Sequence, residues 1–254
     1  MKLRPTVLSI AGYDPSGGAG ILADIKTFEQ NKVYGLGVIS AMTWQNECEF
    51  ERVEWMHVEK IICQIEILHR KSKPEFVKIG LVENAETLTQ VISYLKNYNS
   101  GIKIIWDPVI KASAGFDFHS DTELQKWKDC LEDLFLITPN WNEVNWLSGK
   151  TTGLEAAQEL SKFCHVYLKG GHDPEKPGYD HLITYHSSLI TKNYTFRPKI
   201  KDPQPKHGSG CVFAASLTAL LAKGYPLKKA GLLAKEYTSR FLQSNKGLLG
   251  FHQF

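Results

Sequence analysis

A run of small residues beside a cysteine has the clearest chemical potential in this chain: residues 207–211 (HGSGC), followed by an apolar run over 212–221. The small residues leave the backbone uncovered, and the apolar run predicts a helix that begins where they end. The start of a helix exposes unpaired N–H groups at the positive end of the helix dipole, so it can bind an anion. We therefore expect an anion site at Gly208, Ser209 and Gly210.

Cys211 would lie in that positive helix end, where a thiol loses its proton more easily. An anion site next to such a side chain indicates group transfer to a hydroxyl of a substrate. A structural interpretation also stays open, because a Gly-Ser-Gly run before a helix commonly caps it and a single cysteine in such a helix commonly belongs to the core. Residues elsewhere in the chain have to decide between the two.

The composition is that of a soluble globular protein, with 254 residues and a formal net charge of +3. This length suits one large α/β domain or two small ones. The lysines and arginines are scattered, so nothing favours nucleic acid or a membrane surface as a partner. No apolar run reaches the roughly 18 to 20 residues of a membrane-spanning helix, and the first residues lack the apolar core of a signal peptide.

The five cysteines are odd in number, widely spaced, and form no Cys-x-x-Cys pair. This pattern argues against a disulfide scaffold and against a structural zinc site, and it suits a reducing compartment. Together with the composition, it predicts a cytoplasmic protein.

Strands and helices alternate through most of the sequence. Short apolar runs predict strands over 6–11, 35–43, 76–81, 102–106, 134–138 and 166–169, and an antiparallel pair over 180–185 and 189–196. Helical spacing predicts helices over 21–31, 58–70, 85–98, 124–131, 153–163, 211–223 and 227–244, with another short helix around Glu143. The alternation predicts an α/β fold with a mostly parallel central sheet and helices on both faces. No linker or repeat interrupts it, so we expect a single domain over residues 1–254.

Polar or glycine-rich positions follow nearly every predicted strand. In a mostly parallel sheet, ligands bind beyond the carboxyl ends of the strands. The residues at these ends are Gly12, Asp14, Gln45, Leu81, Asp107, Asn140 and Lys169. We expect them to meet at one edge of the sheet and to contribute to one site.

The glycine-rich turn over 12–20 is not a known nucleotide motif. The chain contains no G-x-x-x-x-G-K-[ST], and no G-x-G-x-x-G follows the first predicted strand. The turn carries Asp14, whose negative charge would repel a phosphate, so we interpret it as a loop around a neutral or polar substrate. A tight strand-to-helix turn without a binding role is the other interpretation.

Asp107, Asn140 and Glu143 offer oxygen atoms that suit hydrated Mg²⁺, which takes few direct protein ligands and shares the rest with phosphates. Asn140 and Glu143 also have the spacing of a capping box, and the two roles are compatible. Lys169 precedes a Gly-Gly turn and is either a solvated lysine or a charge for a nucleotide phosphate. His207 is expected to position its loop rather than to transfer protons.

A resemblance to a known family rests on an ordered set of motifs. Residues 11–20 (AGYDPSGGAG) and 23–28 (ADIKTF) resemble the opening of hydroxymethylpyrimidine and phosphomethylpyrimidine kinases, thiamine-pathway members of the ribokinase-like fold. Later segments are similar to that family's motifs in the same order: 78–80 (KIG), 107–109 (DPV), 138–140 (TPN), 168–172 (LKGGH) and 207–211. Each motif is weak alone, but the set covers nearly the whole chain.

The resemblance implies ATP-dependent phosphorylation of the hydroxymethyl group of 4-amino-5-hydroxymethyl-2-methylpyrimidine, and then of its monophosphate, with Mg²⁺. It implies an anion hole at Gly208, Ser209 and Gly210, and it gives Cys211 the position at which sugar kinases of the fold carry an aspartate base. By the same resemblance, the pyrimidine would contact Gly12, Asp24, Gln45, Leu81 and Val109. ATP phosphates would meet Asp107, Asn140, Glu143, Lys169 and Lys235, with Asp107 and Glu143 in the metal network. A homodimer is also implied.

Three departures leave the substrate open. Lys206 stands where the family usually has a threonine or another small residue, Leu81 replaces a common methionine, and residues 110–118 are a variant of the usual flap. A pyridoxal kinase of the same fold is one alternative, because pyridoxal also offers a hydroxymethyl group on a flat nitrogen heterocycle. A non-catalytic pyrimidine-binding protein is the other, and the presence of Cys211 and of the glycine-rich anion site counts against it.

Overall fold

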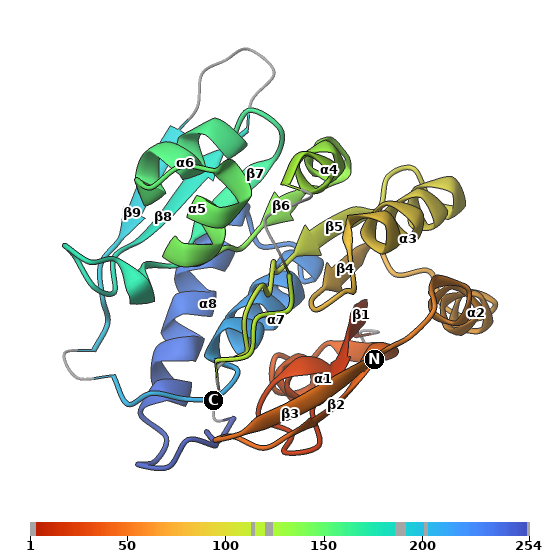
Figure 1. The fold of residues 1–254 in the computed structure, drawn as a ribbon, viewed down its shortest axis with the longest axis horizontal. Helices are drawn as coiled ribbons and strands as arrows, with labels where there is room; N and C mark the ends of the chain where they lie inside the picture. Colours follow the sequence, from red (N-terminus) through yellow and green to blue (C-terminus); the bar gives the residue numbers. More distant parts are fainter. Residues whose placement is uncertain (1–3, 113–114, 120–123, 186–191, 201–202, 253–254) are drawn as a thin grey trace.

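The strands form one sheet in the computed structural model, which describes residues 4–112, 115–119, 124–185, 192–200 and 203–252. They are β1 (Thr6–Tyr13), β2 (Tyr34–Gln45), β3 (Phe50–Trp55), β4 (Phe76–Ile79), β5 (Lys103–Trp106), β6 (Leu136–Ile137), β7 (His165–Leu168), β8 (Asp180–Thr184) and β9 (Lys192–Phe196). Their order across the sheet is β3-β2-β1-β4-β5-β6-β7-β8-β9 (Figure 1).

The centre of the sheet is parallel and its edges are antiparallel. The six strands β2, β1, β4, β5, β6 and β7 are parallel neighbours, whereas β3 pairs antiparallel with β2, and β8 and β9 continue antiparallel beyond β7. The predicted mostly parallel sheet and the predicted antiparallel pair are therefore confirmed. Strand β3 was not predicted from the sequence. Its residues Glu51, Arg52 and Glu54 are exposed, as suits a charged edge strand.

Helices cover both faces of the sheet, as predicted. They are α1 (Gly20–Gln30), α2 (Val58–His69), α3 (Ala85–Tyr98), α4 (Leu124–Asp129), α5 (Trp141–Ser148), α6 (Gly153–Leu160), α7 (Ser209–Ala222) and α8 (Leu227–Leu242). Buried residues of α2 to α6 pack into one hydrophobic cluster with the sheet, and those of α1, α7 and α8 contribute to clusters on the other side (Figure 1). None of these helices is long and apolar enough to cross a membrane.

Helix α7 is the most enclosed helix of the fold. Every residue from Val212 to Leu221 is buried, because the helix is apolar on all sides and lies between the sheet, α1 and α8. It begins at Ser209, two residues before the predicted start, and Gly208 precedes it with a φ of 72°. The chain thus turns sharply into α7 at the glycine-rich segment that the sequence singles out.

Candidate active site

Two glycine-rich loops meet at the start of α7. A Cβ atom on Gly208 would lie 2.1 Å from the carbonyl oxygen of Gly18, and one on Gly18 would lie 2.6 Å from the ring of His207. Only glycine permits both the positive φ of Gly208 and this close approach. The turn after β1 and the turn before α7 therefore form one continuous backbone surface beside the unpaired N–H groups of the helix.

Asp14 holds these two loops together. Its carboxylate accepts hydrogen bonds from Ser16 and from the N–H of Ala19, and its Oδ2 lies 2.9 Å from Nε2 of His207. Burial alone would raise the pKa of Asp14, but the bonds from His207, Ala19 and Ser16 outweigh it and lower that pKa. The positioning role expected of His207 is confirmed. Asp14 is occupied by the loop itself, and the interpretation of this turn as a loop around a neutral or polar substrate stays a prediction.

Cys211 lies in the first turn of α7 and is partly exposed. The N–H of Gly20, at the start of α1, donates a hydrogen bond to its thiol, so the starts of two helices meet there. Even so, burial raises the pKa of Cys211 to about 11, to which Asp107 and Asp24 contribute, whereas Lys78 and Gly20 lower it. The expectation of an unusually acidic thiol is therefore wrong, because loss of solvent outweighs the favourable charges.

Lys169 and Asp107 form the centre of a charged network at the carboxyl ends of β5 and β7. Nζ of Lys169 lies 2.8 Å from Oδ1 of Asp107 and 3.5 Å from Oε2 of Glu143, and Thr138 donates to the same Oδ1. The network adjoins the anion site, since a Cβ on Gly210 would lie 3.2 Å from Nζ of Lys169. Lys169 is therefore a paired, largely enclosed cation beside the start of α7 rather than a solvated lysine.

Asn140 and Glu143 form the predicted capping box at the start of α5. The side chain of Asn140 accepts bonds from the N–H groups of Asn142 and Glu143, and Glu143 accepts from the N–H of Asn140 at 2.6 Å. Burial raises the pKa of Glu143 to about 7, and the nearby Asp107 adds to this, although Lys169 opposes it. The cap thus also brings a second carboxylate to Lys169.

The donor set around Lys169 fits a magnesium ion held in part by water. Asp107, Glu143 and Asn140 provide carboxylate and amide oxygens, the ligand type that Mg²⁺ prefers. Within the described ranges, no group of three or more His, Cys, Asp or Glu side chains is arranged to hold a metal. The protein therefore offers few direct ligands, and a phosphate and water would have to complete the coordination.

Residues predicted to contact the substrate are divided between two places. Gly12 and Leu81 are neighbours, since a Cβ on Gly12 would lie 3.2 Å from Cδ2 of Leu81, and the N–H of Val109 donates to the carbonyl of Asp107. Gln45 donates to Thr43 instead, at a hollow of about 450 Å³ that Tyr13 and Trp44 also line.

Asp24 does not face an open cavity. Its side chain is completely buried, and its Oδ2 accepts hydrogen bonds from Ser9 at 2.6 Å and from Lys78 at 2.8 Å. Its contact with a pyrimidine ring therefore stays a prediction. Sequence analysis did not single out Lys78 as a site residue. The available signal was a single charged residue inside the apolar strand β4.

The described part of the segment after Val109 packs against β3. Lys111 and Asp117 pair as an antiparallel bridge, and residues 113–114 of the predicted flap lie outside the described residues. The ring of Phe116 stacks on Phe50 of β3 with centroids 4.6 Å apart, and Phe118 packs edge-on against the same ring at 5.2 Å. Aromatic contacts thus hold the flap to the edge of the sheet.

Two further lysines are engaged away from the Lys169 network. Lys235 pairs with Asp180 at 2.8 Å and donates to the carbonyl of Gly178, so its predicted contact with ATP stays a prediction. Lys206, which departs from the family pattern, is buried and donates to the carbonyls of Asn245 and Gly247, at 2.7 Å each. It ties the loop before α7 to residues near the end of the described chain.

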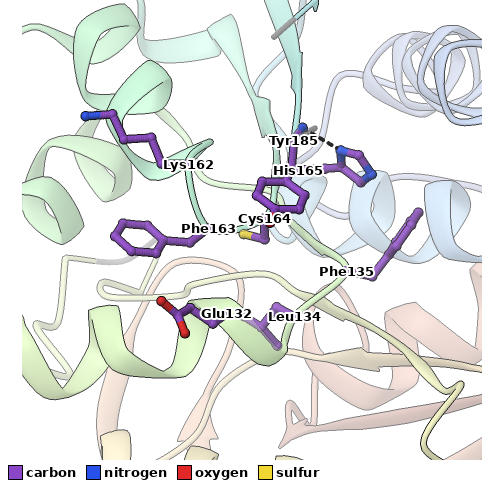
Figure 2. Close-up of a pocket in the computed structure, with 8 residues that line it drawn as sticks. All are labelled: Glu132, Leu134, Phe135, Lys162, Phe163, Cys164, His165 and Tyr185. Atoms are coloured by element: carbon purple, nitrogen blue, oxygen red, sulfur yellow. Dashed lines mark hydrogen bonds between the residues drawn. The ribbon is translucent and has the colours of Figure 1, made fainter. Parts of the chain in front are cut away.

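A further hollow among the described residues lies at the amino ends of β6 and β7 (Figure 2). It has a volume of about 410 Å³, and its lining includes Phe135 just before β6, Cys164 just before β7, and His165, the first residue of β7. Tyr185 closes one side and donates its N–H to Nδ1 of His165 at 2.8 Å. None of the residues predicted to act in catalysis or binding lines this hollow.

Comparisons with known proteins agree with this arrangement. The sequence matches the family model described as phosphomethylpyrimidine kinase over residues 14–252. Hydroxymethylpyrimidine/phosphomethylpyrimidine kinase of Bacillus subtilis is 33% identical over 253 residues, which cover 96% of this chain and 92% of that protein.

Solved structures show the same fold. Phosphomethylpyrimidine kinase from Clostridium difficile 630 is 30% identical with a TM-score of 0.74, covering 93% of this chain and 99% of that one. Pyridoxal kinase from Staphylococcus aureus, solved in complex with AMP-PCP and pyridoxal, is 25% identical with a TM-score of 0.78, covering 96% and 89%. The family match and these relatives establish that the chain belongs to the phosphomethylpyrimidine kinase family and is a phosphotransferase of the ribokinase-like fold.

Proposed function

We propose that this kinase transfers the γ-phosphoryl group of ATP to the hydroxymethyl group of 4-amino-5-hydroxymethyl-2-methylpyrimidine, and then phosphorylates the resulting monophosphate, in thiamine biosynthesis. The observation that carries the proposal is the meeting of three features at the start of α7. These are the backbone cradle of Gly208 to Gly210, the thiol of Cys211, and the cation of Lys169. The names of the relatives supply the pyrimidine.

The chemistry requires positioning and charge stabilisation more than covalent catalysis. In the proposed step, the substrate oxygen forms a bond to the γ-phosphorus while the bond from that phosphorus to the ADP oxygen breaks. The N–H groups at the start of α7 stabilise the charge on the transferred group, and Lys169 stabilises the phosphate oxygens. Cys211, as a thiolate, accepts the hydroxyl proton at Sγ.

The role of Cys211 needs the deprotonated thiol, whose pKa burial raises to about 11. Groups that favour the thiolate are therefore part of the proposed mechanism, and they include Lys78, the N–H of Gly20 and Lys169. They reduce the free-energy cost of a negative sulfur atom at neutral pH.

Mg²⁺ is the proposed metal, and Asp107 and Glu143 would hold it, in part through water. It would neutralise charge on the phosphates of ATP. Use of ATP is supported by the structure of Staphylococcus aureus pyridoxal kinase, which contains the ATP analogue AMP-PCP. The family resemblance further supports a cytoplasmic homodimer, which light scattering of the purified protein would test.

Pyridoxal is the second candidate substrate. A solved relative that contains pyridoxal matches this chain with a TM-score of 0.78. Leu81, beside Gly12, replaces the methionine that is common in the pyrimidine kinases, so the wall of the predicted ring pocket differs. Both candidate substrates are flat heterocycles with a hydroxymethyl group, so the proposed transfer step is the same for each.

The test is a substrate panel. Purified protein with Mg-ATP is given hydroxymethylpyrimidine, its monophosphate or pyridoxal, and ADP and the phosphorylated products are measured. We expect turnover of both pyrimidines, with a specificity constant for pyridoxal about a hundredfold lower. A preference for pyridoxal would assign the protein to vitamin B6 salvage. If none of the three substrates is turned over, the proposal is contradicted and the non-catalytic binding protein is favoured.

A further inference from the structure

Lys78 is a buried lysine in the centre of the sheet. It lies on β4, between β1 and β5, and none of its side chain is exposed. The removal of an ammonium group from water costs several kcal/mol unless other groups compensate for it. Phe76, two residues earlier on the same face of the strand, is a buried apolar residue of the cluster with α7 and α8, so an apolar residue would suit this position on packing grounds.

The surroundings of Lys78 are built to hold its charge. Nζ lies 2.8 Å from Oδ2 of Asp24 on α1, and Ser9 of β1 donates to the same oxygen at 2.6 Å. A Cβ on Gly80 would lie 2.9 Å from Nζ, so the glycine makes room for the ammonium group. Residues of three elements thus converge on this ion pair.

The ion pair is incomplete on one side. Oδ1 of Asp24 is buried and has no hydrogen-bond partner among the described residues. A buried carboxylate that served stability alone would be expected to have both oxygens satisfied. The exception indicates that the pair has a use beyond holding α1 against the sheet.

Cys211 belongs to the helix that packs against both elements of this pair. Helix α7 contacts α1 and β4, and Cys211 lies in its first turn. Among the charged groups that interact with the thiol, Asp107 and Asp24 disfavour its charged form, whereas the cations Lys78 and Lys169 favour it, Lys78 the more strongly. The influence is mutual, because Cys211 and Asp107 both favour the charged form of Lys78.

We propose that Lys78 is a positioning residue for phosphoryl transfer that acts through Cys211: its buried ammonium group stabilises negative charge on the thiol, and Asp24 limits how strongly it does so. Asp24 is then the counter-ion of Lys78 rather than a direct contact of the substrate. This inference rests on the proposed role of Cys211 as the base. It assigns a function to the one buried lysine of β4.

The test uses two substitutions that remove opposite charges. Lys78→Met removes the cation and keeps the length of the side chain, and Asp24→Asn removes the anion and keeps its shape. The rate at which iodoacetamide alkylates Cys211 is measured between pH 7 and 10 in the folded protein without ATP. Mass spectrometry of the Cys211 peptide separates it from the exposed Cys48 and Cys63, which serve as internal controls.

We expect Lys78→Met to slow the alkylation of Cys211 and Asp24→Asn to accelerate it, each by about threefold to tenfold at pH 8. The rates at Cys48 and Cys63 should not change. The double variant should react at a rate between those of the two single variants. A purely structural role would make both single variants change the rate in the same direction, through loosening of the site, and that result would overturn the inference.

Two measurements keep the outcome decisive. Circular dichroism establishes whether Lys78→Met folds; if it does not, Asp24→Asn and the double variant test the inference, because the double variant buries no unpaired charge. Turnover is then measured on the substrate panel. Opposite changes in alkylation without turnover of any substrate would leave the electrostatic link intact and refute the proposed kinase function. Turnover without opposite changes would refute the role of Lys78 alone.

Discussion

Two cysteines lie at opposite ends of the same sheet, Cys164 buried and Cys211 partly exposed, and the charges around their thiols differ. Cys164 precedes β7 at the amino end, where burial raises the pKa of its thiol far above the ordinary value and only the N–H of Ile137 opposes this. Burial also raises the pKa of Cys211 at the carboxyl end, but Lys78 and the start of α1 counteract it. Both thiols lose solvent, yet only one gains compensating charge. Charge at the carboxyl ends, rather than burial, therefore distinguishes the reactive region from the inert one.

The largest expected effect separates these two thiols. Cys211→Ala removes the proposed base and should lower kcat by about 10²- to 10⁴-fold, with a small change in KM. Cys164→Ala is the matched control at the amino end and should leave kcat within about twofold while lowering thermal stability. Steady-state kinetics on the preferred substrate measures both. Near-full turnover in Cys211→Ala would remove the basis of the comparison.

The glycines at the start of α7 give the next largest effect. Gly208→Ala places a methyl group 2.1 Å from the carbonyl oxygen of Gly18 at a φ of 72°, so the two loops must move apart. We expect kcat to fall by about a hundredfold. Gly210→Ala brings its methyl group to 3.2 Å from Nζ of Lys169, which needs a shift of only a few tenths of an ångström, and should lower kcat by less than Gly208→Ala does. Equal losses in the two variants would show that the contact between the loops is unimportant.

The carboxyl end should also respond to pH. The pKa of Glu143 in the folded state is about 7, above its unfolded value of 4.5, so its protonated form favours folding. That contribution is present below pH 4.5 and is lost as the pH rises to about 7, which lowers the free energy of unfolding by about 3 kcal/mol. Glu143→Gln should remove this dependence of the free energy of unfolding on pH. Urea unfolding of both proteins at pH 5, 6 and 7 measures that dependence. If it is the same in the variant, Glu143 is not the group responsible.

The smallest effect is expected towards the amino end. His69, the last residue of α2, is buried, and both of its ring nitrogens lack partners among the described residues. Its ring stacks on Tyr98 with centroids 4.0 Å apart, so phenylalanine can keep the packing. His69→Phe should raise the free energy of unfolding by about 1 kcal/mol without changing kcat. Chemical denaturation at pH 7 tests it, and destabilisation would mean that the nitrogens have a role.

The sequence predicts the fold well where periodicity is strong. The range of α3 was predicted to the residue, and the central parallel strands follow from their apolar runs. Strand β3 was not predicted because its charged residues Glu51, Arg52 and Glu54 obscure the alternation of apolar and polar residues that is typical of a strand. β3 is a strand because it pairs with β2, and this pairing depends on the tertiary structure rather than on the local sequence.

The proximity of some candidate site residues was predictable, but their protonation was not. Motif positions predicted that Asp107, Lys169 and Glu143 would lie together, and they do. The high pKa of Cys211 depends on burial from several elements, which sequence spacing does not report. Lys78 was not predicted as a site residue for the same reason. Its ion pair with Asp24 of α1 depends on the packing of two elements and cannot be inferred from the sequence of β4.

The bonds of Lys206 have a consequence for the order in which the protein matures. Lys206 reaches the carbonyls of Asn245 and Gly247, the N–H of His207 donates to Leu248, and the ring of His207 contacts Asp14. The anion loop is thus joined to segments from both ends of the described chain. During synthesis, these bonds cannot close until residue 248 has left the ribosome. A nascent chain therefore contains every strand of the described sheet before this loop can be tied to residues 245–248.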